Sequence, residues 1–253
     1  MSKKYNLTAV VVAAARLIPN GAQLTFRAPV IAKSARPGQF VFVKPALLRE
    51  PVLRRAFSVS AVDRVKGDVS VYFDIKGEGT RALAALKKGD TLAVTGPCGH
   101  GFDPHGFGRR NLLVAGGCGI APMLFLATEL KKKGRKVDFY YGARTASQLV
   151  YRRELGRLCD TLTLATDDGS AGTRGVITRR LPDSPETPVF ACGPRAMLNA
   201  FQRLRPDAQV ALEAEMACGV GVCMGCAVKM ADGSLTRCCV EGPVFRASEV
   251  SWN

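Results

Sequence analysis

The feature that most constrains this chain is a group of thiols near its carboxyl end. Cys218, Cys223 and Cys226 follow the spacing C-x4-C-x2-C, and a fourth thiol comes from the adjacent pair Cys238 and Cys239. This spacing is typical of plant-type [2Fe–2S] clusters, in which four thiolates hold two irons. The sequence therefore predicts a cluster-binding loop, and it leaves open which member of the pair supplies the last ligand.

The residues between the thiols agree with such a loop. Gly219, Gly221 and Gly225 would let the backbone pass close to the sulfurs and turn N–H groups toward them. A structural zinc site usually combines two C-x2-C pairs or mixes Cys with His, whereas this loop has one such pair and no nearby His. A disulfide framework would require an oxidising compartment, which nothing else in the sequence indicates.

At 253 residues the chain is long enough for two domains, each with its own core. The amino terminus has two lysines followed by an apolar run, but Asn6, Thr8 and Arg16 interrupt that run and favour a strand over a secretory signal. No apolar stretch is long enough to cross a membrane. We therefore expect a cytoplasmic protein without membrane insertion, whose nine cysteines are ligands or buried residues rather than disulfides.

The net charge of +15 raises the question of nucleic-acid binding. The basic residues, however, are spread along the chain, and the longest run, at 131–133, falls at the end of a predicted helix, where cations interact favourably with the dipole. We expect no nucleic-acid binding. A basic surface that faces nucleotide cofactors or an acidic partner protein explains the charge better.

The first half of the chain has the pattern of a small antiparallel barrel. Apolar alternation recurs in short segments separated by Pro and Gly turns, with one helical segment at 80–87. The strand segments are 7–12, 24–28, 40–43, 56–61, 69–75 and 91–94. On one of them, Arg55 and Ser58 flank Phe57 and offer donors for a phosphate beside an aromatic ring. A glycine turn at 77–80 opens the helix and forms a second candidate anion site.

The second half alternates strands with helices, which predicts a parallel, doubly wound sheet with ligands at the carboxyl ends of its strands. The expected strands are 111–115, 137–141, 161–166, 189–192 and 210–213, and the expected helices are 121–133, 147–158 and 195–204. The glycine-rich turn at 116–122 departs from the G-x-G-x-x-G fingerprint, but it still presents N–H groups at a helix start. Together with the loops at 166–170 and 192–194, this turn predicts a nucleotide-binding site.

Four of these motifs, taken in order, resemble the ferredoxin–NADP⁺ reductase superfamily. They are R-x-[FY]-S at 55–58, G-x-G-T at 77–80, G-G-x-G-x-A-P at 116–122 and C-G-P at 192–194. With the thiol loop and its exit sequence C-V-E-G-P-V-F at 239–245, the chain is most similar, within that superfamily, to the electron-transfer subunits of bacterial class 1B dihydroorotate dehydrogenases. The resemblance covers nearly the whole chain.

The resemblance implies an FAD-binding β-barrel domain at 1–105, an NAD-binding α/β domain at 106–213 and a [2Fe–2S] subdomain at 214–253. The implied FAD contacts are Arg55, Ala56, Phe57, Ser58, Tyr72, Phe73, Asp74, Gly79 and Thr80. The implied NAD contacts are Gly117, Gly119, Asp167, Asp168 and Cys192. The implied cluster ligands are Cys218, Cys223, Cys226 and, from the C-x-[DE]-G-P exit motif, Cys239.

Two positions depart from the family pattern, since Asp74 stands where a basic residue is common and His100 replaces a more usual Asn. The chain shows no constellation for general acid–base chemistry on a substrate, so we name no catalytic residue. The resemblance implies that electrons pass between NAD(H), FAD, the cluster and the FMN of a separate catalytic subunit that oxidises dihydroorotate. The resemblance also implies that this chain and the catalytic subunit form a heterotetramer, which would serve pyrimidine biosynthesis.

Other interpretations stay open. A small flavin and iron–sulfur subunit of an NADH-dependent ferredoxin–NADP⁺ oxidoreductase, or of a sulfide dehydrogenase, would share the fold, but it typically has Asp where this chain has Cys218. A reductase for an oxygenase would meet its partner transiently, and a zinc-holding binding module would have no turnover. Asp167 and Asp168 favour NAD over NADP, whereas Arg144 could accept a 2′-phosphate.

Overall fold

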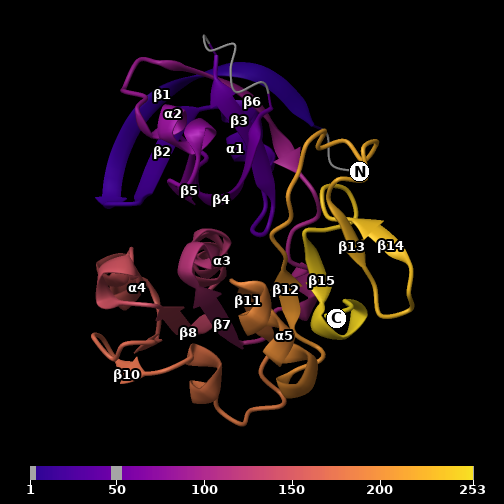
Figure 1. The fold of residues 1–253 in the computed structure, drawn as a ribbon. Coiled ribbons are helices and arrows are strands. Elements are labelled where there is room, and N and C mark those ends of the chain that lie inside the picture. Colours follow the sequence, from indigo (N-terminus) through magenta and orange to yellow (C-terminus); the bar gives the residue numbers. More distant parts are fainter. Residues whose placement is uncertain (1–3, 47–52, 253) are drawn as a thin grey trace.

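The computed structural model of the protein describes residues 4–46 and 53–252, and it shows a barrel stacked on an α/β layer (Figure 1). The barrel comes from the first part of the chain, and the sheet with its helices comes from the second. The last part, yellow in Figure 1, lies along one side of both. Residues 1–3 and 47–52 of the predicted FAD-binding domain, and residue 253 of the predicted cluster subdomain, lie outside the described residues.

The barrel is closed and antiparallel, with strand order β1-β2-β5-β4-β3-β6, which confirms the prediction from alternation. Its strands are β1 (Tyr5–Ile18), β2 (Gly21–Arg27), β3 (Phe40–Pro45), β4 (Arg55–Asp63), β5 (Asp68–Asp74) and β6 (Thr91–Cys98). Successive side chains of a strand face opposite sides, so alternate residues point inward. Leu24 and Phe26 of β2, for example, lie buried opposite Val71 and Val69 of β5.

Two short helices accompany the barrel. Helix α1 (Pro29–Ser34), which the sequence did not lead us to expect, begins with a proline and contacts β5 and β6. Helix α2 (Glu78–Ala84) begins and ends earlier than the predicted 80–87. It ends earlier because the Lys87 N–H donates to the Asp90 carboxylate at 2.7 Å, and this bond forms the turn into β6.

The sheet has the order β10-β9-β8-β7-β11-β12-β15. Its strands are β7 (Arg110–Gly116), β8 (Lys136–Ala143), β9 (Thr161–Thr166), β10 (Thr173–Arg174), β11 (Val189–Cys192), β12 (Gln209–Ala211) and β15 (Val244–Arg246). The pairs are parallel, as predicted, apart from β15, which joins β12 in the antiparallel sense. The order of strands reverses between β7 and β11, and ligands of open α/β sheets bind at this point, beyond the carboxyl ends.

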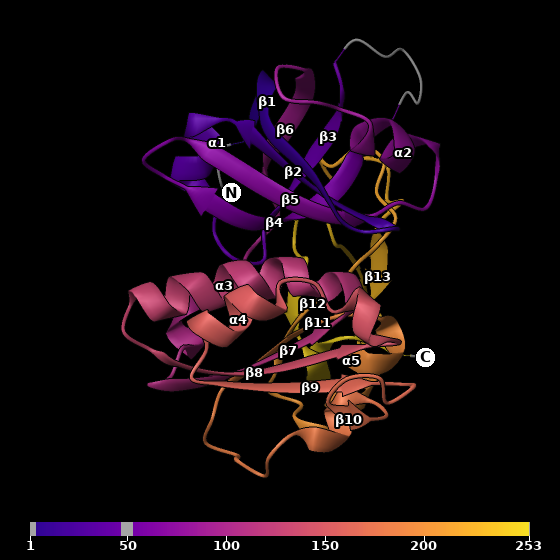
Figure 2. The same ribbon diagram turned by 90° about the vertical axis from the view of Figure 1, so that its left-hand side faces the viewer.

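Helix α3 (Ile120–Lys132) lies between the barrel and the sheet (Figure 2). It contacts β4 of the barrel as well as β7 and β8 of the sheet. Phe125 packs into the barrel core, whereas Met123 and Leu126 pack into the core above the sheet. A helix covered on two faces must be apolar nearly all round, which explains the long hydrophobic run in this part of the sequence.

Helix α5 (Arg195–Leu204) covers the opposite face of the sheet, where Leu198 and Phe201 pack with Val114. A hairpin of β13 (Ala227–Lys229) and β14 (Leu235–Arg237) stands beside the sheet. Short 3₁₀ turns lie at Pro104–Gly106, Gly117–Gly119, Ala146–Gln148, Ile177–Arg180 and Ala247–Glu249. Within the described ranges, no helix combines the length and apolarity needed to cross a membrane.

Helix α4 (Arg152–Leu158) begins later than the predicted start at 147. The preceding residue, Tyr151, has a left-handed φ of 60°, and its hydroxyl donates to Gln23 of the barrel at 2.6 Å. Its ring also packs edge-on against Tyr72, with ring centroids 5.8 Å apart. These contacts with the barrel override the helical periodicity of the segment, so the prediction for 147–151 is wrong.

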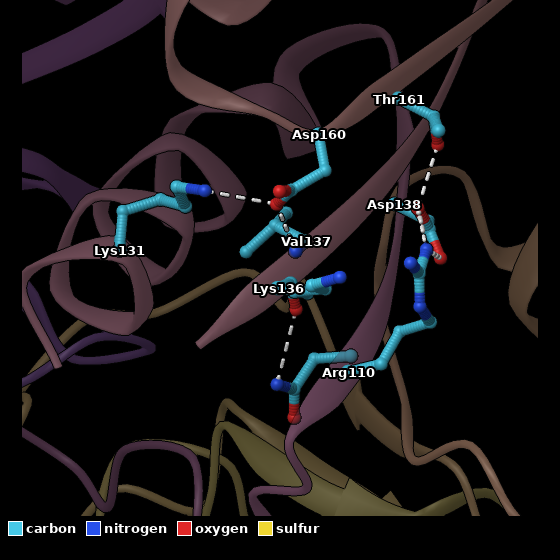
Figure 3. A network of polar contacts seen from close by, with 8 residues as sticks. Arg110, Lys131, Lys136, Val137, Asp138, Asp160 and Thr161 are labelled. Atoms are coloured by element: carbon cyan, nitrogen blue, oxygen red, sulfur yellow. Dashed lines mark hydrogen bonds and ion pairs between the residues drawn. The ribbon is translucent and has the colours of Figure 1, made fainter. Parts of the chain in front are cut away.

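A polar network joins the amino ends of the central strands (Figure 3). Arg110 on β7 donates from Nη1 to both carboxylate oxygens of Asp138 on β8, at 2.6 Å each. Thr161 on β9 donates to the same carboxylate at 2.8 Å. Beside it, Asp160 pairs with Lys131 of α3 at 2.9 Å. The Asp138 carboxylate therefore links three neighbouring strands.

We expect Asp138→Ala to destabilise the protein. The Asp138 side chain is only 12% exposed, and losing hydrogen bonds to a charged group of this kind lowers the free energy of unfolding by about 2 kcal/mol. Urea denaturation of the cofactor-loaded protein measures the change. Asp183→Ala, at an exposed carboxylate, is the matched control and should cost less than about 0.5 kcal/mol. Equal stability of the two variants would contradict the role of the network.

Candidate functional site

A cleft of about 250 Å³ lies where the barrel faces the carboxyl ends of the sheet strands. Eight predicted cofactor residues line it, namely Ala56, Phe57, Ser58, Tyr72, Phe73, Asp74, Thr80 and Cys192. Met216 and Pro243 from the last part of the chain also belong to the lining. The cleft is thus built from barrel, sheet and thiol-bearing segments together.

The barrel wall of the cleft is aromatic. Phe57 on β4 and Phe73 on β5 stack with ring centroids 4.6 Å apart and an interplanar angle of 24°. Ser58 and Asp74 add polar atoms at the same wall. A flat aromatic surface with a few polar groups suits a planar ring system such as isoalloxazine.

Arg55 lies against the start of α2. A Cβ built on Gly79 would come within 2.8–2.9 Å of Nε, Cζ and Nη2 of Arg55, so a side chain here would displace the guanidinium. Thr80 Oγ1 accepts the N–H groups of Lys76 and Gly77 at 2.9 and 3.0 Å and so shapes the turn. A guanidinium held beside an open glycine turn is a fitting partner for a pyrophosphate.

The glycine turn after β7 lies against the end of β11. A Cβ on Gly119 would lie 2.1 Å from the carbonyl oxygen of Cys192, so the two backbones touch. Gly117 has a φ of +52° and open space where a Cβ would be. Cys192 is buried at this junction, and burial raises the pKa of its thiol. The turn therefore leaves room for a dinucleotide beyond β7 and β11.

Asp168 and Arg144 lie away from the cleft lining. Asp168 Oδ1 accepts the N–H and the hydroxyl of Ser170 at 3.0 and 2.6 Å, which lowers the pKa of this carboxyl. The Asp168 N–H donates to the carbonyl of Arg144 at 3.3 Å, so the two residues mark the neighbouring ends of β8 and β9. Asp167 joins the same edge through its own N–H bond to Ala143.

Cys118 and Glu213 also reach the cleft, and sequence reasoning missed both. Burial raises the pKa of the Cys118 thiol, and the Asp74 carboxylate beside it raises it further. Burial likewise raises the pKa of Glu213, an effect that Lys76 opposes and Asp74 reinforces. Cys118 occupies a variable position of the motif at 116–122, and Glu213 belongs to none of the motifs. Their position after β7 and β12 is the only signal that could have identified them.

Backbone N–H groups in the thiol loop point at the sulfurs. Val220 N–H approaches Cys218 Sγ at 3.5 Å, and Gly225 N–H approaches Cys223 Sγ at 3.4 Å. The bond from Val220 holds the pKa of Cys218 down, at about 6. N–H groups directed at thiolates are the outer contacts that iron–sulfur clusters use, so the donor chemistry of the loop fits such a group.

The thiol loop is packed directly on the barrel. A Cβ on Gly219 would lie 2.2 Å from the ring of Phe42 on β3. Phe42 in turn meets Phe40 edge-on, with centroids 5.5 Å apart, and Phe40 lines the cleft. Lys4 also anchors the loop, because its Nζ donates to the Gly219 carbonyl at 3.0 Å. One pair of aromatic rings therefore fills the space between cleft and loop.

The adjacent thiols at 238 and 239 differ in their surroundings. Cys239 N–H approaches Cys226 Sγ at 3.4 Å, whereas the Cys238 thiol donates to the Leu212 carbonyl at 3.7 Å. Burial raises the pKa of both, and Cys226 beside Cys239 raises that of Cys239 further, to about 12.

Among the described residues, no three Cys, His, Asp or Glu side chains are grouped to hold one metal ion.

His100 lies exposed at the barrel end. Its N–H donates to the carbonyl of Gly242 at 2.6 Å, so its backbone links the barrel to the exit motif.

Comparison with known proteins assigns each segment to a family. Residues 213–251 match the iron–sulfur cluster binding domain of dihydroorotate dehydrogenase B. Residues 113–203 match the oxidoreductase NAD-binding domain, and residues 8–102 match the oxidoreductase FAD-binding domain.

Two relatives match this chain along nearly its whole length. The dihydroorotate dehydrogenase B (NAD(+)) electron transfer subunit of Desulforamulus reducens is 37% identical over 100% of both chains. That of Bacillus caldolyticus is 40% identical over 94% of this chain and 96% of the relative. This chain belongs to the family of dihydroorotate dehydrogenase B electron transfer subunits. It is an oxidoreductase component with FAD-binding, NAD-binding and [2Fe–2S]-type domains, as the sequence predicted.

Two solved reductase structures are similar to this chain in fold. The NADH-dependent reduced ferredoxin-NADP oxidoreductase, studied for flavin-based electron bifurcation, superposes with a TM-score of 0.84 at 30% identity, covering 96% of this chain and 90% of that one. A ferredoxin reductase of carbazole 1,9a-dioxygenase superposes with a TM-score of 0.66 at 25% identity, covering 79% and 65%. This chain thus shares its fold with other reductases.

We expect Gly219→Ala to disturb the cluster loop of this family member, because a Cβ would collide with Phe42. The iron and sulfide content per chain, with the visible absorbance, should fall well below that of the unmodified protein. Gly233→Ala is the matched control, since Gly233 has a similarly positive φ of +86° but open space around it. Equal iron content in the two variants would show that the Phe42 contact does not shape the loop.

Proposed function

We propose that the chain carries electrons between NAD(H) and the FMN of a separate catalytic subunit that oxidises dihydroorotate in pyrimidine biosynthesis. The observation that carries this proposal is the composition of the cleft, which joins Phe57 of the barrel, Cys192 of the sheet and Met216 of the thiol-bearing segment. The full-length likeness to the electron transfer subunits supports it. Net flow in biosynthesis runs from dihydroorotate to NAD⁺.

FAD supplies the exchange between the paired electrons of a hydride and the single electrons that a [2Fe–2S] cluster accepts. The residues of this chain orient the reacting groups and keep water out. In our proposal Arg55, Gly79 and Thr80 hold the FAD pyrophosphate. The barrel residues that hold the flavin and adenosine parts are Ala56, Phe57, Ser58, Tyr72, Phe73 and Asp74.

The sheet residues hold the nicotinamide nucleotide in this proposal. Gly117 and Gly119 leave the backbone open to its pyrophosphate, and Cys192 faces the nicotinamide from the end of β11. Asp168 follows β9 at the carboxyl edge of the same sheet. Its negative charge there would repel a 2′-phosphate, so it favours NAD over NADP.

Cys218, Cys223, Cys226 and Cys239 are the cluster ligands in this proposal. Cys239 is favoured over its neighbour because its N–H meets the sulfur of Cys226, whereas the Cys238 thiol is engaged by the Leu212 carbonyl. The pair Phe40 and Phe42 fills the space between these ligands and the cleft, so water is excluded from the path between them.

We expect Cys239→Ser to lose the cluster, because an alkoxide oxygen is a harder and weaker ligand for iron than a thiolate. The iron content and the visible charge-transfer absorbance report the loss. Cys238→Ala is the matched control, and it should keep both, since in our proposal its thiol binds no iron. The reverse pattern, with iron lost in Cys238→Ala and kept in Cys239→Ser, would assign the fourth ligand to Cys238.

The exposed side of the thiol loop offers a docking surface for the catalytic subunit. Val220, Val222 and Met224 are apolar, yet they are 54%, 78% and 44% exposed. Apolar side chains left in solvent beside a redox group are typical of surfaces that a partner protein covers. The FMN-containing subunit would dock here, in a heterotetramer, and bring its flavin near the cluster.

We expect Val222→Asp to separate the two half-reactions. NADH-driven dye reduction should be unchanged, because the cleft is untouched, whereas NAD⁺ reduction by dihydroorotate with the catalytic subunit present should fall about tenfold or more. Val65→Asp, at an exposed apolar residue on the barrel, should change neither. A protein that binds FAD and iron but shows no NADH-driven dye reduction would refute the proposed function itself.

A second candidate is the small subunit of an NADH-dependent ferredoxin–NADP⁺ oxidoreductase, because such a solved structure superposes with a TM-score of 0.84. Cys218 argues against it, since those subunits typically have Asp as the first ligand. The native complex decides between the two candidates. Only an assembly with a dihydroorotate-oxidising FMN subunit reduces NAD⁺ at the expense of dihydroorotate.

A further inference from the structure

A second cavity, of about 420 Å³, opens at the other end of the sheet, away from the cofactor cleft. Its lining consists of five cationic residues and one glycine, namely Arg109, Arg110, Lys133, Gly134, Arg135 and Lys136. They come from the start of β7 and from the turn that joins α3 to β8, and Figure 3 shows Arg110 and Lys136 at this end of the strands. We propose that this cavity binds an oligophosphate group.

Cations near a helix end have an ordinary explanation, since they interact favourably with the helix dipole. Lys131 and Lys132 at the end of α3 fit that explanation, and each also has a carboxylate partner. Lys131 pairs with Asp160 at 2.9 Å, and Lys132 pairs with Glu129 at 3.0 Å. Neither of these lysines lines the cavity.

The cations that line the cavity are different. Arg110 has Asp138 as its partner. Among residues 4–46 and 53–252, no carboxylate lies within ion-pair distance of the other four, namely Arg109, Lys133, Arg135 and Lys136. Like charges gathered around one hollow repel each other, and a multivalent anion in the hollow would turn that repulsion into attraction.

Backbone hydrogen bonds fix the segments that carry these cations. Lys136 N–H donates to the Arg109 carbonyl at 2.7 Å, and Arg135 N–H donates to the Leu130 carbonyl at 3.0 Å. Gly134 between them has a left-handed φ of +68° with open space where a Cβ would be, so no side chain at this position narrows the cavity. The backbone around the opening is therefore prearranged, and a ligand has to order only the basic side chains.

The shape and chemistry of the cavity select a compact oligophosphate. Guanidinium groups bind phosphate oxygens in pairs, and ammonium groups add point charges. The lining contains no aromatic or aliphatic residue that would hold a base, so the phosphates make the contacts. A single hollow, rather than an extended basic groove, fits a short chain of phosphates better than a nucleic acid. Free tripolyphosphate and the triphosphate of a nucleotide share this chemistry.

Isothermal titration calorimetry of the cofactor-loaded protein tests the site, with saturating NAD⁺ present so that the nucleotide cleft is filled. We expect tripolyphosphate to bind saturably at one site per chain, with an affinity that falls as salt is added. The double variant Arg135→Gln/Lys136→Gln should weaken binding about tenfold. It should leave NADH-driven dye reduction unchanged, which also shows that the variant folds.

The matched control is Lys87→Gln/Lys88→Gln, which removes the same charge from exposed positions on the barrel and should leave the affinity unchanged. Equal binding of tripolyphosphate and ATP would support recognition of phosphates alone, and tighter binding of ATP would support a nucleotide ligand. The proposal is overturned by absence of saturable binding, by equal weakening in the two double variants, or by preference for an RNA oligonucleotide over tripolyphosphate.

Discussion

The hydrogen bonds of the exit segment at 242–244 hold the three cofactor regions together. The Gly242 carbonyl accepts the His100 N–H of the barrel at 2.6 Å, and the Pro243 carbonyl accepts the Leu212 N–H beyond β12 at 2.9 Å. Strand β15 then pairs with β12, with Val244 opposite Ala211. The thiol loop therefore cannot move away from the cleft unless backbone pairing breaks, which fixes the separation of the regions proposed for flavin and cluster.

Packing reinforces this arrangement on both sides of the cleft. Helix α3 is buried between barrel and sheet, so the two cannot slide past each other without exposing Phe125 and Leu126. Phe40 and Phe42, each only 3% exposed, fill the space toward the thiol loop. Electron transfer between resident cofactors requires fixed geometry and a dry interior, and the chain provides both through backbone pairing and aromatic packing.

Much of this molecule could be predicted from short-range patterns, because alternation and glycine turns mark the strands and thiol spacing marks the loop. What the sequence could not show depends on contacts between distant residues. Tyr151 leaves the helical pattern because it bonds to Gln23, and Gly219 is required because Phe42 lies beneath it. Asp168 follows a sheet strand, as a ligand often does, but its carboxylate closes its own turn through Ser170.

The most direct test of electron passage through this chain is low-temperature EPR spectroscopy of the FAD- and iron-loaded protein after anaerobic addition of NADH. Because barrel, sheet and thiol-bearing segments line one cleft, we expect the spectrum of a reduced [2Fe–2S] cluster to appear without any partner subunit. A flavin that bleaches while no reduced-cluster signal develops would contradict electron transfer from the cleft to the thiol loop.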